Sequence, residues 1–221
     1  MTEARTALVF DIDGTLIDSE HIDGTLFVQA VKEVLGDIRF ADDWSNYTKV
    51  TDVGILNEIL EFNGIHPDPE LVAAVRERFR VLLADYFASG GICPPLPGVQ
   101  PFLRLLSATP DISLGIATGG WGITARMKLA SAGISIDEIP LSSSEDSDDR
   151  TLIMRHCLGY MGGPFTRTVY IGDGIWDRNA CRSLGWHFIG IGSKLKGHCA
   201  LWFEDFADIP ALLSAILIGR G

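Results

Sequence analysis

Leu8-Val9-Phe10-Asp11-Ile12-Asp13-Gly14-Thr15-Leu16 joins an apolar run to two carboxylates and then to a glycine. An apolar run that breaks at a glycine predicts a buried strand ending in a turn. Side chains at positions i and i+2 of a strand point to the same face, so Asp11 and Asp13 should emerge side by side at its carboxyl end. In an open α/β sheet, ligands bind at that end.

The pair of carboxylates predicts a bound cation or a shared proton at this site. Two ionised carboxylates about 4 Å apart repel by roughly 4 kcal/mol at an effective dielectric near 20, so a fold that joins them usually supplies a cation or a shared proton. Mg²⁺ suits this site better than zinc, because no His or Cys lies nearby in sequence. A solvated acidic turn is the alternative, since Asp-x-Asp-Gly also occurs in ordinary loops.

The motif has a second, incomplete copy. Ile12-Asp13-Gly14-Thr15-Leu16 recurs ten residues later as Ile22-Asp23-Gly24-Thr25-Leu26, but no apolar strand precedes the second copy. The apolar residues that follow it have helical spacing. We therefore expect the second copy to begin a surface helix.

Length and composition indicate a soluble globular protein. A chain of 221 residues suits one domain with an insertion, or two small domains. The apolar segment 212–218 is too short to span a membrane. The first five residues lack the features of a signal peptide, so we expect a cytoplasmic protein.

The charge balance limits the classes of partner. The formal net charge of −11 argues against nucleic acid and against an anionic membrane. A small anionic substrate stays possible if a metal ion and a few basic groups reverse the potential locally. The four cysteines show no Cys-x-x-Cys spacing, so we expect free thiols. Both a monomer and a homodimer are compatible with the sequence.

A helical block follows the first motif. Between residues 18 and 91 the apolar residues recur at three- and four-residue spacing, and no strand pattern appears. Pro94-Pro95-Leu96-Pro97-Gly98 is a stiff segment suited to a hinge. We therefore expect an inserted, all-helical cap domain at residues 18–94 and a core formed by residues 1–17 and 95–221.

After the hinge, helical and strand patterns alternate. Helices are expected at 99–108, 123–132, 151–160, 178–184 and 209–217, and strands at 113–117, 139–142, 168–172 and 187–191, with a further edge segment before the last helix. Strands alternating with helices of this length predict an α/β fold with a doubly wound parallel sheet.

Two later segments carry polar groups at predicted strand ends. Gly172-Asp173-Gly174-Ile175-Trp176-Asp177 places one acid after a buried strand and another at a helix entry. Asp173 could bind a metal, while Asp177 could instead cap the helix. Thr118 and Gly119 offer a hydroxyl and a backbone N–H suited to an anion, although an ordinary turn explains them equally well.

Taken in order, these three segments resemble the first, second and fourth motifs of the haloacid dehalogenase-like hydrolase superfamily. The helical insertion resembles the cap of its phosphoglycolate phosphatase and β-phosphoglucomutase-like branch. The resemblance implies a Rossmann-like core and a Mg²⁺-dependent phosphatase. Such an enzyme would hydrolyse a small phosphorylated metabolite, a phosphate monoester, through an aspartyl phosphate on Asp11.

The resemblance also implies roles for single residues. Asp11 would be the nucleophile and Asp13 the acid and base. The metal ligands would be Asp11, Asp13 through its carbonyl, Asp173 and Asp177, the last either directly or through another ligand. Thr118 and Gly119 would hold phosphoryl oxygens, and Thr15 and Lys49 are further candidate substrate ligands.

One departure concerns the third motif, which in the family carries a lysine. Here Ser147-Asp148-Asp149-Arg150-Thr151 stands in its place, and Arg150 is the candidate substitute, with a larger planar head than a lysine. Lys128 lies in the preceding amphipathic helix, where we expect a solvated face. Lys49, Thr51 and Asp52 lie between two cap helices and either contribute to specificity or form a solvated loop.

Two other functions stay open at this stage. A phosphomutase of the same branch would use the same core but transfer the phosphoryl group onward to a sugar. A phosphate-sensing module similar to a receiver domain would also use an acidic cluster, a Thr and a basic residue. The long cap and the position of Asp13, two residues after Asp11, argue against the module.

Overall fold

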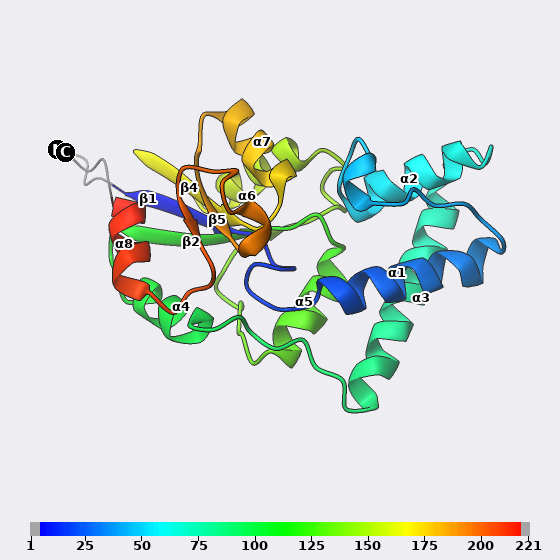
Figure 1. Cartoon of the computed structure of the whole chain (residues 1–221), viewed down its shortest axis with the longest axis horizontal. Coiled ribbons are helices and arrows are strands. Elements are labelled where there is room, and N and C mark those ends of the chain that lie inside the picture. Colours follow the sequence, from blue (N-terminus) through cyan, green and yellow to red (C-terminus); the bar gives the residue numbers. More distant parts are fainter. Residues whose placement is uncertain (1–4, 218–221) are drawn as a thin grey trace.

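The computed structural model describes residues 5–217 and contains a parallel sheet flanked by helices (Figure 1). Within this range the sheet has six strands in the order β3-β2-β1-β4-β5-β6, and all neighbours are parallel. The strands are β1 (Thr6–Phe10), β2 (Ile112–Ala117), β3 (Leu141–Ser142), β4 (Arg167–Gly172), β5 (His187–Ile191) and β6 (Trp202–Phe203). The predicted α/β doubly wound sheet is confirmed.

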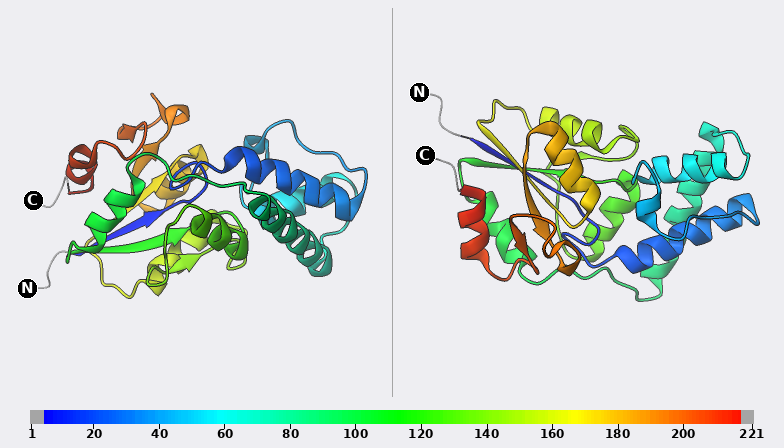
Figure 2. Two further views of the ribbon diagram at one scale, coloured as in Figure 1. Left: turned by 90° about the horizontal axis from the view of Figure 1, so that it is seen from below. Right: turned by 45° about the horizontal axis from the view of Figure 1, so that its top comes forward.

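Helices cover both faces of the sheet. Successive side chains of a strand point to opposite faces, so each face presents apolar side chains that a helix can bury. Leu8 and Phe10 of β1 pack in one apolar cluster with α4 (Val99–Ser107), α5 (Gly122–Ser131) and α8 (Ile209–Leu217). Val9 packs in another cluster with α6 (Arg150–Tyr160) and α7 (Ile175–Leu184). Figure 2 shows these helices on the two sides of the strands.

The start of α7 differs from the prediction. The helix begins at Ile175 rather than at residue 178, because Gly174 is its N-cap and Asp177 belongs to its first turn. The N–H of Gly174 donates to Oδ2 of Asp177 at 3.2 Å. Asp177 therefore accepts the N–H of the N-cap residue from a position within the first turn. The capping role expected as an alternative is thus present, although Asp177 is not itself the N-cap.

Three long helices follow β1 and lie together at the end of the molecule opposite α8 (Figure 1). They are α1 (Glu20–Leu35), α2 (Asp52–Phe62) and α3 (Pro69–Ala88). Their inward residues, such as Phe27, Leu56 and Phe79, form an apolar cluster of their own, which Trp121 of the core joins. Burial of this cluster, rather than helix propensity, stabilises the three helices.

The chain enters and leaves these helices through adjacent segments. The N–H of Asp18 donates to the carbonyl of Pro94 at 2.8 Å, and the N–H of Leu96 donates to the carbonyl of Leu16 at 3.1 Å. These contacts hold together the segments on either side of the three helices. The division into a cap at residues 18–94 and a core stays a prediction.

The strand register brings distant segments to one edge of the sheet. Phe10 pairs with Ile116 of β2 and with Ile171 of β4. Asp11, Thr118 and Asp173 therefore all follow neighbouring strands at their carboxyl ends, which is where open α/β sheets bind ligands.

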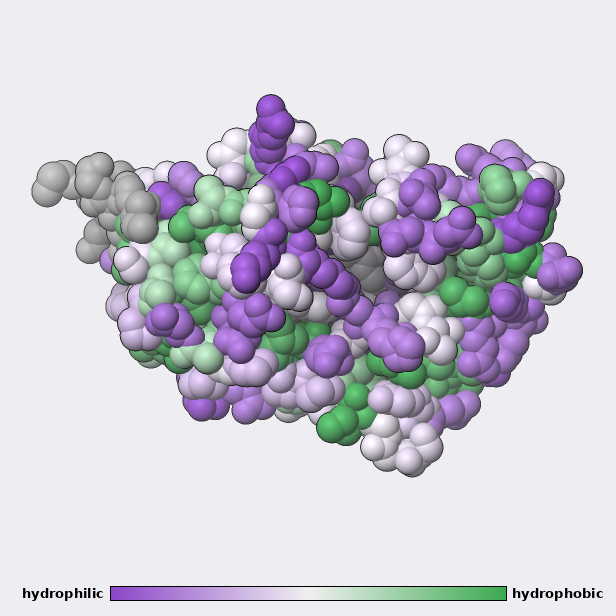
Figure 3. All heavy atoms as spheres, viewed as in Figure 1, coloured by the Kyte–Doolittle hydropathy of each residue, from purple (hydrophilic) through white to green (hydrophobic). Residues whose placement is uncertain are grey.

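The surface is mixed in character. On the face shown in Figure 3, hydrophilic residues are interspersed with smaller apolar areas. Within residues 5–217, none of the helices combines the length and the apolar character that crossing a bilayer requires.

Candidate active site

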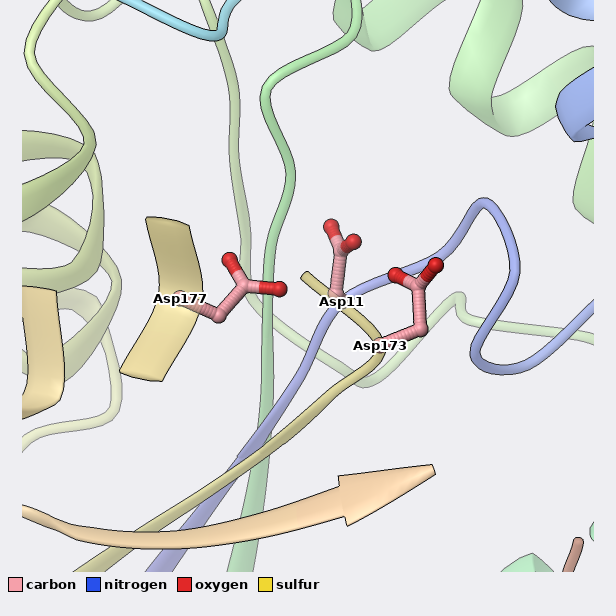
Figure 4. A group of neighbouring side chains, drawn as sticks. All are labelled: Asp11, Asp173 and Asp177. Carbon is pink, nitrogen blue, oxygen red and sulfur yellow. The ribbon is translucent and has the colours of Figure 1, made fainter. Parts of the chain in front are cut away.

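Three buried carboxylates meet at the carboxyl edge of the sheet. Asp11 follows β1, Asp173 follows β4 and Asp177 lies in the first turn of α7 (Figure 4). One oxygen from each lies within 4.8 Å of the others. The relative exposure of the three residues is 4%, 6% and 0%, so water screens their repulsion poorly.

This crowding shifts the ionisation of the cluster. Burial, with repulsion from Asp177 and Asp13, raises the pKa of Asp11 to about 8, although Arg150 opposes the shift. Burial, followed by repulsion from Asp11 and Asp177, raises the pKa of Asp173 well above its ordinary value. Three oxygen ligands that repel one another in this way fit a hard divalent cation such as Mg²⁺.

Gly14 gives the cluster its space. Its backbone has φ +73°, a conformation that favours glycine, and a Cβ at this position would collide with the Asp173 carboxylate. The glycine that ends the first motif thus lets the turn after β1 approach Asp173 of the fourth. Thr15, the next residue, is fully buried and donates through Oγ1 to Oδ1 of Asp173 at 3.4 Å.

Arg150 supplies positive charge beside the cluster. From the start of α6, its Nη1 lies 3.1 Å from Oδ1 of Asp177 and 3.4 Å from Oδ1 of Asp11. Its Nη2 donates to the carbonyl of Val50 at 3.0 Å. Burial lowers the pKa of Arg150, but Asp177 and Asp11 outweigh burial and raise it overall. Arg150 therefore lies next to Asp11, as a substitute for the family lysine requires.

Asp13 has partners of its own. Nζ of Lys128 donates to Oδ1 and Oδ2 of Asp13 at 2.6 and 2.7 Å, and Oγ of Ser19 also donates to this carboxylate. The Asp13 side chain is absent from the three-carboxylate cluster within the described residues, so only its backbone carbonyl stays a candidate metal ligand. Since β1 ends at Phe10, Asp13 lies in the turn, where strand alternation no longer fixes its direction.

The expectation of a solvated position for Lys128 is wrong. Its side chain has 0% exposure and also pairs with Asp23 of α1. The buried face of α5 consists of Thr124, Ala125, Lys128 and Leu129, so the helical spacing itself placed the lysine inward. Burial lowers the pKa of Lys128, but the carboxylates of Asp13 and Asp23 outweigh burial and hold it above its ordinary value.

The second copy of the first motif also belongs to this site. It lies in a helix, as expected, but the surface position is wrong for Asp23, whose side chain is only 18% exposed. Burial raises the pKa of Asp23 to about 6, opposed by Lys128 and increased further by Asp13. One buried lysine of α5 therefore joins a carboxylate after β1 to a carboxylate of α1.

Thr118 and Gly119 form a tight loop after β2. Oγ1 of Thr118 accepts the N–H of Gly120 at 3.1 Å. A Cβ on Gly119 would lie 2.9 Å from the carbonyl oxygen of Val50 and 2.5 Å from Nη2 of Arg150. Only glycine lets the loop, the cap segment and the guanidinium approach one another this closely.

The first residue of α2 and its N-cap are docked on this loop, so the solvated-loop alternative is wrong for Thr51 and Asp52. These residues are 2% and 9% exposed. The N–H of Asp52 donates to the carbonyl of Gly119, and Oδ2 of Asp52 accepts the N–H of Trp121, both at 2.8 Å. The side chain of Lys49 is 46% exposed and pairs with Asp148, outside the cavity described next.

A cavity of about 130 Å³ lies between the core and the three long helices. Its core side is lined by Asp11, Asp13, Thr118, Gly119, Arg150 and Asp173. Its cap side is lined by residues of α1, α2 and the segments next to them, including Phe27, Trp44 and Asp52. Most of the predicted site residues therefore surround one space. Lys128, Asp23 and Asp52 join them through contacts that the sequence motifs do not encode.

Comparison with solved structures gives close fold similarity at low identity. A hydrolase from Pseudomonas syringae has a TM-score of 0.75 and 22% identity, covering 95% of this chain and 98% of its own. β-Phosphoglucomutase from Clostridium difficile has a TM-score of 0.74 and 16% identity, covering 98% and 97%. CbbY from Rhodobacter sphaeroides in complex with phosphate has a TM-score of 0.71 and 20% identity, covering 92% and 95%.

The expected resemblance to the phosphoglycolate phosphatase and β-phosphoglucomutase-like branch is therefore confirmed at the level of the fold. The curated proteins searched include no match to this chain. A sequence model of the haloacid dehalogenase-like hydrolases matches residues 6–185, a range that includes all three motifs. The chain belongs to the haloacid dehalogenase-like hydrolase family.

Proposed function

We propose that this hydrolase is a Mg²⁺-dependent phosphatase that acts on a small phosphate monoester through an aspartyl phosphate on Asp11. The observation that carries the proposal is the position of Asp11 in the cavity, beside Arg150, with Thr118 and Gly119 in the same wall. Such positioning and charge compensation are most of what phosphoryl transfer requires.

The first half-reaction forms the covalent intermediate. A carboxylate oxygen of Asp11 attacks phosphorus, and the bond from phosphorus to the ester oxygen breaks. Asp13 gives its proton to the departing oxygen, so the leaving group departs as a neutral alcohol. Arg150 and the hydroxyl of Thr118 stabilise the charge on the phosphoryl oxygens as the bond breaks.

The second half-reaction releases phosphate. Asp13, now ionised, accepts a proton from a water molecule, whose oxygen attacks the phosphorus of the aspartyl phosphate. The bond from phosphorus to the Asp11 oxygen breaks, which restores the carboxylate and yields inorganic phosphate. When bound by Asp11, Asp173, Asp177 and the Asp13 carbonyl, Mg²⁺ would supply positive charge to the phosphoryl group.

Metal removal tests the proposal directly. Phosphate release from a panel of phosphorylated metabolites should require Mg²⁺, and EDTA should lower the rate by at least about a hundredfold because several kcal/mol of charge stabilisation is lost. Addition of excess Mg²⁺ should restore the rate. A rate that survives exhaustive chelation would contradict the role of the carboxylate cluster.

Arg150 can be tested by truncation. Arg150→Ala should lower kcat by about 10²- to 10³-fold, the range typical for removal of one preorganised charge-stabilising donor. Arg155→Ala is the matched control, because Arg155 is an exposed residue of the same helix. Steady-state kinetics with saturating Mg²⁺ measures both variants. Activity within a few-fold of the parent enzyme would remove Arg150 from the mechanism.

Hydrolysis is favoured over the phosphomutase alternative by the cap wall. A mutase that transfers its phosphoryl group to a sugar passes through a bisphosphate and needs a second anion site. The cap residues that line the cavity are apolar, acidic or small and neutral, and none of those described is basic.

Steady release of phosphate without a bisphosphate product would exclude the mutase, whereas a phosphorylated form that lasts for hours would support a sensing module.

A further inference from the structure

The cap wall of the cavity combines aromatic rings with carboxylates. Phe27 and Trp44 both line the cavity, with ring centroids 5.8 Å apart in an edge-to-face arrangement. Glu20, Asp23 and Asp52 line it as well. Aromatic faces and carboxylates each attract cations, and the carboxylates repel a second anionic group of a substrate.

One of these carboxylates forms no ion pair of its own. Asp23 pairs with Lys128, and Glu20 pairs with Lys194, an exposed residue that does not line the cavity. Among the described residues, Asp52 forms no ion pair. Asp52 is also nine-tenths buried. Burial, followed by repulsion from Asp23, raises the pKa of Asp52 well above its ordinary value, and the more distant charge of Lys128 opposes this shift only in part.

The geometry of Asp52 leaves half of its carboxylate available. Oδ2 accepts the N–H of Trp121, whereas Oδ1 accepts no hydrogen bond from any residue in the described range. A Cβ built on Gly120 would lie 3.7 Å from Oδ2 of Asp52 and 3.7 Å from Oδ2 of Asp13. Asp52 and Asp13, the residue that protonates the leaving oxygen in the proposed mechanism, therefore both lie close to Gly120 and line the same cavity. In that mechanism the leaving group departs into this cavity.

We propose that the leaving group of the substrate carries an ammonium group that pairs with Asp52 in the part of the cavity wall that Phe27 and Trp44 also line. The substrate class is then the phosphate monoester of a small amino alcohol. This inference rests on the proposed phosphatase function and specifies its substrate. The cavity of about 130 Å³ supports a small leaving group, because pockets for drug-sized ligands occupy roughly 300 to 1,000 Å³.

Three small monoesters of different charge test the charge preference by hydrolysis. Phosphoethanolamine carries an ammonium group, propyl phosphate is its neutral isostere, and phosphoglycolate carries a carboxylate. With Mg²⁺, kcat/KM should be at least about tenfold higher for phosphoethanolamine than for propyl phosphate, and lowest for phosphoglycolate. Equal or higher kcat/KM for propyl phosphate or phosphoglycolate would overturn the inference.

The variant Asp52→Asn tests the residue itself. Asparagine keeps an acceptor for the Trp121 N–H but removes the charge, so the ratio of kcat/KM for phosphoethanolamine to that for propyl phosphate should fall toward one. Glu61→Gln is the matched control, because Glu61 is an exposed acid at the far end of the same helix, and it should preserve the ratio. An unchanged ratio in Asp52→Asn would overturn the assignment of Asp52.

A binding measurement separates this inference from the phosphatase proposal. Calorimetry with Mg²⁺ compares 3-aminopropylphosphonate with butylphosphonate, two analogues that lack the scissile P–O bond. The amino compound should bind at least about tenfold more tightly. If it does while none of the monoesters, p-nitrophenyl phosphate included, is hydrolysed, the phosphatase proposal fails and the cation site stands. If hydrolysis occurs but butylphosphonate binds as tightly, only the ammonium inference fails.

Discussion

Asp11→Asn is expected to abolish phosphate release, with kcat lowered by at least about three orders of magnitude. An amide oxygen is a poor nucleophile and brings no negative charge to the candidate metal site, so both the attack on phosphorus and the binding of a divalent cation suffer. The substitution is nearly isosteric, and it removes one of the three charges that raise the pKa values in the cluster. The variant should therefore fold, and it should resist thermal unfolding at least as well as the parent without Mg²⁺.

Two measurements give this result its meaning. Phosphate release should be compared with that of Asp37→Asn, because Asp37 is an exposed acid between α1 and α2 and lies outside the cavity. Mass spectrometry of acid-quenched reactions should find a phosphoryl group on the parent enzyme and none on Asp11→Asn. A variant that keeps more than about a tenth of the parent's kcat would exclude Asp11 as the nucleophile.

The parts of the site that follow strand ends could be predicted from the sequence because local rules fix them. An apolar run followed by an acid identifies Asp11 and Asp173 as strand-end residues, and the parallel topology then brings them together. The same rule predicted that Asp11 and Asp13 would emerge side by side, and both line the cavity. The rule does not identify the partner of Asp13, because β1 ends at Phe10 and the carboxylate of Asp13 contacts Lys128.

The residues that the motifs did not identify are joined by contacts between distant segments. Lys128 meets Asp13 across 115 positions of sequence, and Trp121 meets Asp52 across 69. Such pairs follow from how the cap helices dock on the core, which no local pattern specifies. For Lys128 a usable signal did exist, since it shares the buried face of α5 with Ala125 and Leu129. A charged residue on that buried face requires a buried partner, which a solvated position would not supply.

Lys128→Met is expected to lower the free energy of unfolding by about 3 to 5 kcal/mol, the usual result when one partner of a buried ion pair is removed. Methionine matches the length of the lysine side chain closely, so loss of packing contributes little. The cost arises because Asp13 and Asp23 would be left together, largely buried and without the cation that both contact. Urea denaturation followed by circular dichroism measures the change. Lys32→Met, at an exposed position of α1 where Nζ lies over the Phe40 ring, should stay within about 1 kcal/mol of the parent.

The double variant Lys128→Met with Asp23→Asn distinguishes charge from packing. If the cost is electrostatic, removal of one uncompensated carboxylate should return about 1 to 3 kcal/mol of the lost free energy of unfolding. The reason is that the effects of substitutions within one ion-pair network do not add. If the cost reflects packing, the two losses should simply add. A recovery would also bear on catalysis, since the same lysine orients the proposed acid and base. Lys128→Arg keeps the charge but enlarges the head group, so both carboxylates would keep a cation while Asp13 would be displaced. The fall in kcat, expressed as a free energy, should therefore exceed the fall in the free energy of unfolding.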